Sequence, residues 1–172
     1  MNKFDTLIQE ALSFNKTFKA PDSNEKAQRR SEVFEDALSK VEKTKLEDGT
    51  WHVHGEINLI NAMGVNLKSL DGLNVSIVDG DFWCCDNGLD NLLGGPRYVG
   101  GSYYCGNNRM KSLKGCAEIV KDVFDCTVNN LTSLEGCPKE VGRNFYCKDN
   151  KRKFDVFADV SKRCKVGGRI SV

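Results

Sequence analysis

Apolar residues in the C-terminal two thirds of the chain recur at a fixed interval. A valine opens each copy, and successive copies are 21 residues apart: Val78, Val99, Val120 and Val141. Four residues after each valine stands an aromatic residue, and a cysteine follows two residues later. These residues are Phe82, Tyr103, Phe124 and Phe145, followed by Cys84, Cys105, Cys126 and Cys147. Self-similarity at such a period is the signature of a solenoid, in which each coil stacks on the one before it.

Within each copy the pattern V-x-G-x-F-x-C alternates in a way that predicts a strand with one buried face. An asparagine three residues after each cysteine ends the strand, and its side chain is expected to bond backbone groups of the turn: Asn87, Asn108, Asn129 and Asn150. An S-L-x-G segment then returns the chain, with its leucine inward and its glycine in a tight turn. Imperfect copies begin at Val53 and Val166, so the sequence predicts about six parallel strands.

The central part of the copy, F-x-C-x-x-N-x-L at residues 82–89 and 124–131, resembles the leucine-rich repeat. The likeness covers residues 51–172, and the segment LTSLEGCPKEVG with its F-x-C strand looks like the short-repeat proteins encoded by large tailed bacteriophages. The resemblance implies a β-solenoid whose inner curved sheet binds a partner. The first copy carries extra residues, INAMGVN, and in the last full copy Arg152 replaces an apolar residue. Both departures fall at the ends, where solenoid coils are expected to be atypical.

The first quarter of the chain has a helical pattern instead. Apolar residues at helical spacing predict one amphipathic helix over residues 3–16 and a second from about 22 to 44, with Asp22 and Glu25 as a capping box after Pro21. The segment KLEDGTWHV then predicts a hairpin with an Asp-Gly turn. The expected fold class is therefore α+β, with a helical cap over residues 1–50 and a leucine-rich-repeat solenoid over 51–172. A helical pair that binds a partner is the alternative to a cap.

Eight cysteines raise the question of disulfides or metal ligands. A straight row of cysteines on strands about 4.8 Å apart fits neither, because disulfides need Cβ atoms about 3.8 Å apart and a zinc site needs sulfurs that converge. We therefore expect the row to pack as small buried apolar side chains, with Cys116 and Cys137 as a second repeating pair. Cys85 is expected to face outward, and Cys164 lies outside the pattern.

The two histidines, His52 and His54, alternate around Val53 and share one face of a strand. No acid or cysteine follows them at a recognised ligand spacing, so the sequence predicts solvent-facing histidines and no metal site. No cofactor is implied. No nucleophile with a base and no pair of carboxylates stands at a motif spacing, and we therefore expect the chain not to be an enzyme.

Charge and hydropathy bear on the ligands of the protein and on its place in the cell. Lys and Arg number 25 and Asp and Glu 24, so the net charge of +1 gives no overall argument for nucleic acid or an anionic membrane. The start of the chain lacks the pattern of a signal peptide, and no apolar run approaches the roughly 20 residues of a membrane span. These features predict a cytoplasmic protein, in the host cell if the chain is phage-encoded.

Residues that alternate with the buried aromatic and cysteine positions form columns on the exposed face of the predicted sheet. The candidate partner-binding residues are Asp81, Trp83, Tyr104, Asp125, Thr127, Tyr146 and Lys148. Aromatic side chains are enriched at interface hot spots, whereas the alternative is ordinary cross-strand packing. The sequence and the resemblance together predict a protein-binding module, encoded by a phage and directed at a host protein as an inhibitor or modulator. The second hypothesis is a nucleic-acid-binding protein that uses Tyr104, Tyr146 and the basic stretch from Lys148.

Overall fold

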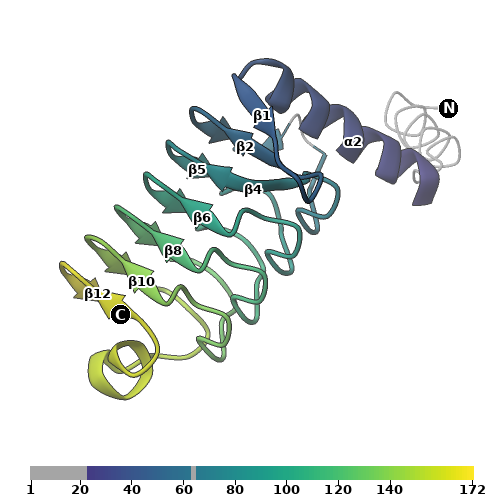
Figure 1. Ribbon diagram of the computed structural model, residues 1–172. Coiled ribbons are helices and arrows are strands. Elements are labelled where there is room, and N and C mark those ends of the chain that lie inside the picture. The colour runs from purple at the N-terminus through teal and green to yellow at the C-terminus, as the bar shows by residue number, and fades with distance from the viewer. Residues whose placement is uncertain (1–22, 63–64) are drawn as a thin grey trace, which may run out of the picture.

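The computed structural model describes residues 23–62 and 65–172, and it shows a helix at one end of a parallel β-solenoid (Figure 1). Helix α2 (Ser23–Ser39) is the first element of the described residues, and the coils then follow one another in sequence order. Each coil contributes to two sheets, which we name sheet A and sheet B. Sheet B has six strands, one for each coil, so the expected number of about six coils is confirmed.

The strands of each sheet follow the order of the chain. Sheet A contains β1 (Lys43–Lys45), β2 (Trp51–Val53), β4 (Val75–Val78), β6 (Tyr98–Val99), β8 (Ile119–Val120), β10 (Glu140–Val141) and β12 (Lys165–Val166). Sheet B contains β3 (Ile57–Asn58), β5 (Phe82–Trp83), β7 (Tyr103–Tyr104), β9 (Phe124–Asp125), β11 (Phe145–Tyr146) and β13 (Ile170–Ser171). All pairs are parallel except β1 with β2. Equivalent residues of successive coils lie opposite one another, as Val78 and Val99 do in sheet A.

The expectation of one strand for each copy is wrong, because the V-x-G-x-F-x-C segment bends at a corner and enters both sheets. At the corner after β4, a Cβ atom added to Gly80 would lie 2.9 Å from the backbone of Gly55 in the coil before, so the coils approach closely there. Polar side chains occupy the corner as well. The Asp81 carboxylate accepts a hydrogen bond from the Ser102 backbone N–H (2.6 Å), and the Ser102 hydroxyl accepts one from Val123 N–H (3.3 Å). These bonds satisfy backbone donors that a continuous strand would have paired.

The predicted asparagine ladder is confirmed after the four sheet B strands β5, β7, β9 and β11. The Asn108 side-chain amide donates to the carbonyls of Cys84 (3.0 Å) and Cys105 (3.1 Å), and its oxygen accepts from Leu89 N–H (2.9 Å). Asn87, Asn129 and Asn150 make corresponding bonds. Each asparagine therefore ties two successive coils together through backbone groups that face the core.

The core lies between the two sheets and the returning segments. Valines from sheet A, the aromatic and cysteine columns from sheet B, and leucines from the returns are all buried. The return glycines are required by their backbone: Gly136 has φ +81°, and a Cβ there would meet the Leu113 carbonyl at 2.7 Å. The sequence pattern therefore placed the inward-facing residues correctly even though the strand bends.

The N-terminal end is closed by α2 and the hairpin. Helix α2 buries Val33 and Phe34 and packs against β3, and β1 pairs antiparallel with β2, which confirms the hairpin. The helix ends at Ser39 instead of residue 44, because the chain from Lys43 onward joins sheet A. The predicted helix over residues 3–16 and the capping-box residue Asp22 lie outside the described residues.

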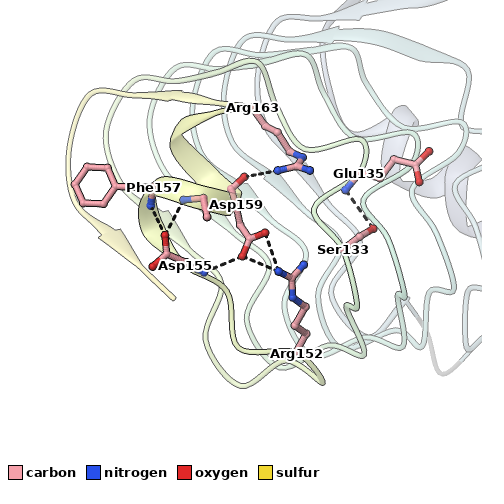
Figure 2. Close-up of polar contacts among 8 residues, drawn as sticks. Ser133, Glu135, Arg152, Asp155, Phe157, Asp159 and Arg163 are labelled. Carbon is pink, nitrogen blue, oxygen red and sulfur yellow. Dashed lines mark hydrogen bonds and ion pairs between the residues drawn. The ribbon is translucent and has the colours of Figure 1, made fainter.

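The C-terminal coil returns through a π-helix, η2 (Val156–Ser161), drawn in yellow at the opposite end of the solenoid from α2 (Figure 1). Figure 2 shows the polar contacts that hold it. Asp155 caps the helix by accepting from Phe157 N–H (2.9 Å) and Ala158 N–H (2.6 Å). Arg152 makes two bonds of 3.0 and 3.1 Å to the buried Asp159, and Arg163 donates to the Asp159 carbonyl (3.0 Å). Arg152, which replaces the apolar residue of the repeat, therefore helps to hold the helix of the terminal coil through Asp159.

Candidate functional site

Four of the candidate binding residues form a single column on the outer face of sheet B. The register of β5, β7, β9 and β11 places Trp83, Tyr104, Asp125 and Tyr146 next to one another in that order. All four side chains are half-buried. We call this set the aromatic column. The sequence predicted its members and their order, because in-register parallel strands bring equivalent positions to the spacing between strands, about 4.8 Å.

The first two members of the aromatic column stack face to face. The ring centroids of Trp83 and Tyr104 are 5.9 Å apart, and the ring planes differ by only 6°. Beneath them, Phe82 and Tyr103 pack at 4.9 Å between centroids on the inner face of the same strands. The backbone that carries the stacked pair is therefore fixed from below, and the pair forms an ordered, half-buried apolar cluster on the outer face of sheet B.

The other two members of the aromatic column, Asp125 and Tyr146, have more polar surroundings. Thr127 donates to the Asp125 carboxylate from both its backbone N–H (2.9 Å) and its hydroxyl (2.7 Å). The Tyr146 hydroxyl accepts from the Asn144 side-chain amide at 3.1 Å. Asp125 and Thr127 thus bond to each other, which leaves Tyr104 and Tyr146 as the aromatic residues on either side of them.

The remaining candidates, Asp81 and Lys148, lie at different places. Asp81 is the corner residue described above, and its carboxylate is committed to the backbone of the next coil. Lys148 is exposed and follows β11 in the column next to the aromatic one. The structure therefore groups Trp83, Tyr104, Asp125, Thr127 and Tyr146, and it sets Asp81 and Lys148 at the edges of that group.

The outer face of sheet A carries the half-buried Tyr98 and Ile119, and charged side chains lie next to them along the chain. Glu118 lies between Arg97 (2.6 Å) and Lys139 (2.5 Å), and Lys121 pairs with Glu140 (3.3 Å). Hydrogen bonds from Lys139 and Arg97 lower the pKa of Glu118 to about 2. The charges on this face therefore pair with one another across neighbouring coils.

The two histidines have an acidic neighbour that no short ligand spacing in the sequence indicated. Asp79 lies beside both of them, with its carboxylate 2.8 Å from His52 Nε2 and 3.2 Å from His54 Nδ1. The hydrogen bond from His52 is the main cause that lowers the pKa of Asp79. The repeat contained the signal for this contact: Asp79 follows Val78 as His54 follows Val53, so stacking of the coils brings the two positions together.

The thiols lie as expected for packing residues. The four cysteines of the sheet B column are buried, and Cys164, which the pattern left unassigned, is buried as well. Cys85 faces outward but is half-buried, and burial together with the neighbouring Asp86 raises its pKa to about 11. A thiol with so high a pKa carries little thiolate at neutral pH, so Cys85 is a poor nucleophile.

Comparison with known proteins adds no relative: no family model matches the chain, and no curated protein or solved structure shows significant similarity to it. Within residues 23–62 and 65–172, no helix is long and apolar enough to cross a membrane.

Proposed function

We propose that this protein is a binding module for another protein and that the stacked Trp83–Tyr104 pair is the centre of its contact surface. The observation that supports the proposal is the parallel stack of two half-exposed aromatic rings on a sheet whose inner face is packed. Aromatic side chains in such positions dominate the energetics of many interfaces. The aromatic column spans three strand spacings, or about 15 Å, which suits the centre of a modest interface.

The rigidity of the sheet B backbone also supports this proposal. The four strands that carry the aromatic column bond to their neighbours and are each followed by a ladder asparagine, so the backbone under the aromatic column is ordered before a partner arrives. Little conformational entropy would then be lost on binding, and more of the contact energy would appear as affinity. The exposed Lys148 would contribute to the polar rim of the contact, whereas the Asp81 carboxylate already bonds the backbone of the next coil.

The type of partner follows from the sequence likeness. The F-x-C-x-x-N-x-L pattern and the asparagine ladder support assignment of the solenoid to the leucine-rich-repeat type. The phage-like form of the repeat favours a host protein in the bacterial cytoplasm as the target, with inhibition or modulation as the result of binding.

Nucleic acid is the competing ligand, and one contact weighs against it. The basic stretch near the C-terminus includes Arg152, whose guanidinium is bonded to Asp159 and lies 5.2 Å from the Phe154 ring. Lys148, Lys151 and Lys153 remain exposed, so this part of the stretch is open to phosphate groups, and the nuclease treatment described next distinguishes the two ligands.

The test is capture of partners from a bacterial lysate with and without nuclease, followed by affinity measurement on the purified partner. We expect a protein whose recovery does not depend on nuclease. Tyr104→Ala should weaken its binding by at least about 2 kcal/mol, or about 30-fold, with little change in melting temperature. Lys139→Ala on sheet A is the matched control and should bind like the unmodified protein.

Two results would contradict the proposal. One is recovery that nuclease abolishes, together with loss of binding when Lys151 and Lys153 are changed to Ala. The other is unchanged affinity in both Trp83→Ala and Tyr104→Ala.

A further inference from the structure

We propose that His52, His54 and Asp79 form a binding site for a divalent transition-metal ion of the zinc type on the outer face of sheet A. The inference is independent of the proposed partner binding, which concerns the opposite sheet. It rests on the geometry of three side chains from two successive coils and on the groups around them.

The three side chains converge on one point. One ligand atom from each residue, an imidazole nitrogen or a carboxylate oxygen, can be chosen so that all three lie within 4.8 Å of one another. The carboxylate is 2.8 Å from His52 Nε2 and 3.2 Å from His54 Nδ1. Two ligands bound to zinc at about 2.0–2.1 Å with tetrahedral angles are about 3.3 Å apart. Small side-chain movements therefore suffice to bring the three atoms around one ion.

The backbone holds these side chains in register. His54 N–H donates to the Glu42 carbonyl (2.9 Å) in the hairpin, and Asp79 N–H donates to the Val53 carbonyl (3.0 Å) between the two histidines. The rings of His52 and His54 are 4.3 Å apart between centroids. The site is thus built from β2 and the end of β4, with no long loop to order when the ion binds.

Thr44 of β1 supplies the outer partner that a metal-bound histidine normally has. Its hydroxyl lies 2.8 Å from His54 Nε2, the ring nitrogen that points away from Asp79. A hydroxyl both donates and accepts, so it can serve His54 in either tautomer. When Nδ1 binds the ion, the ring proton is on Nε2, and the Thr44 hydroxyl accepts a hydrogen bond from Nε2–H. This bond orients the ring and raises the basicity of the ligand nitrogen.

The donor set selects the class of ion. Two imidazole nitrogens and one carboxylate oxygen suit zinc and the neighbouring transition metals, whereas magnesium and calcium prefer oxygen donors throughout. The side chains of His52 and His54 are 26% and 32% exposed, so an ion has access and a fourth position remains open to water. Two lysines of the same hairpin are directed elsewhere. The amino groups of Lys43 and Lys45 lie over the Trp51 ring, at 5.5 and 5.7 Å from its centroid.

The bound ion would join three segments at the N-terminal end of the solenoid. His52 and His54 belong to the first coil, Asp79 to the second, and Thr44 to the hairpin strand. An ion that binds only when these segments are folded stabilises them in proportion to its concentration. The site would therefore tie the first coil and hairpin to the body of the solenoid.

The test uses the full chain and Zn²⁺ as the probe. Isothermal titration should show one ion bound for each chain and a melting temperature that rises with Zn²⁺ concentration. His52→Ala, His54→Ala and Asp79→Asn should each weaken binding at least about tenfold, and Thr44→Val should weaken it about tenfold through loss of the outer partner. Glu56→Gln and Cys85→Ser are the controls for an exposed acid and a half-exposed thiol, and both should leave affinity unchanged.

A second measurement avoids dependence on variants that fold poorly. In the unmodified protein, the ring nitrogen resonances of both histidines should shift on addition of Zn²⁺, and Co²⁺ should give visible absorption that Zn²⁺ removes. The proposal is overturned by affinity weaker than about 100 µM in the folded protein, by histidine resonances that do not move, or by histidine variants that bind Zn²⁺ as tightly as the unmodified chain.

Discussion

The two sheets of the solenoid have the same coil spacing, but different side chains line them. Beneath sheet A lies a column of valines, and its outer face carries the half-buried Tyr98 and Ile119, next to charged side chains that pair across coils, such as Arg97 with Glu118. Beneath sheet B lie large aromatic rings and cysteines, and its outer face carries the aromatic column. Stacking of equivalent positions therefore repeats whichever residue type a position holds, and it gives sheet A its rows of paired charges and sheet B its row of aromatic rings.

The inner and outer faces of sheet B are expected to have different roles, one in stability and the other in binding. The aromatic rings inside sheet B contact one another along the solenoid, from Phe82 through Tyr103 and Phe124 to Phe145. The stacked Trp83–Tyr104 pair lies directly outside this column. We expect changes inside sheet B to lower stability, changes outside it to lower affinity, and changes to the ion pairs around Glu118 outside sheet A to do little of either.

The largest effect is expected from the core of sheet B. Phe124→Ala should lower the free energy of unfolding by about 3–5 kcal/mol, because the ring is fully buried between Tyr103 and Phe145. Val120→Ala, in the same coil under sheet A, removes two methyl groups and should cost roughly 2 kcal/mol. Urea unfolding of both variants measures the difference. Equal costs would show that the two halves of the core contribute alike.

A smaller loss is expected from the end of the sheet B strands. Asn129→Ala should cost about 2–3 kcal/mol, since the amide bonds the carbonyls of Cys105 (3.1 Å) and Cys126 (3.3 Å) and the oxygen accepts from Met110 N–H (3.1 Å). Asn130→Ala changes the neighbouring exposed asparagine and should have little effect on unfolding. If both variants unfolded at the same denaturant concentration, the ladder would not be a source of stability.

The repeat made much of this arrangement predictable. Because the coils stack in register, the spacing of the valines, aromatics, cysteines and asparagines was sufficient to predict the number of coils, the inward residues, the asparagine ladder and the order of the aromatic column. The pattern could not show the corner. An extended strand and two strands around a corner both place Val99, Tyr103 and Cys105 inside, so alternation alone does not distinguish them.

Two features at the ends were missed for a different reason. The contact of Asp79 with His52 and His54 joins residues 25 or more positions apart, and a search for ligands at short sequence spacing does not find it. The π-helix η2 forms where the repeat breaks, and its buried Asp159 bonds Arg152 in a geometry that no repeat position encodes. Terminal coils lack a neighbour on one side, so local contacts replace the repeating ones.

The cysteine column beneath sheet B should tolerate change. Cys105→Val keeps approximately the same volume in a fully buried position, so the free energy of unfolding should fall by less than about 1.5 kcal/mol. Cys126→Val should cost slightly more, because the Cys126 thiol also donates to the Tyr146 carbonyl at 3.4 Å. Thermal unfolding and metal analysis check this together. Zinc that is present in stoichiometric amount and lost on either replacement would show that the column is a metal site.

The smallest effect is expected on the outer face of sheet A, where Glu118 pairs with Arg97 and Lys139. The side chains of Arg97 and Lys139 are exposed and that of Glu118 is 39% exposed, so Glu118→Gln should lower the melting temperature only slightly at neutral pH and low salt, and high salt should reduce the difference further. The direction with pH follows from the lowered pKa. An unfolded glutamate titrates near pH 4.3 and the folded one at about 2, so the stabilisation is complete above the unfolded pKa and is lost as the pH falls through the folded value.

Melting temperatures of the unmodified protein and Glu118→Gln at pH 7, 4 and 2 test this dependence on titration. The difference between them should be constant from neutral pH down to about 5 and should shrink toward zero near pH 2. Glu135→Gln is the matched control, since no ion pair involves the Glu135 carboxylate in the part of the chain that the structure describes, and its difference from the unmodified protein should stay small throughout. A difference for Glu118→Gln that persisted at pH 2 would mean that the residue stabilises sheet A by packing and not through its ion pairs with Arg97 and Lys139.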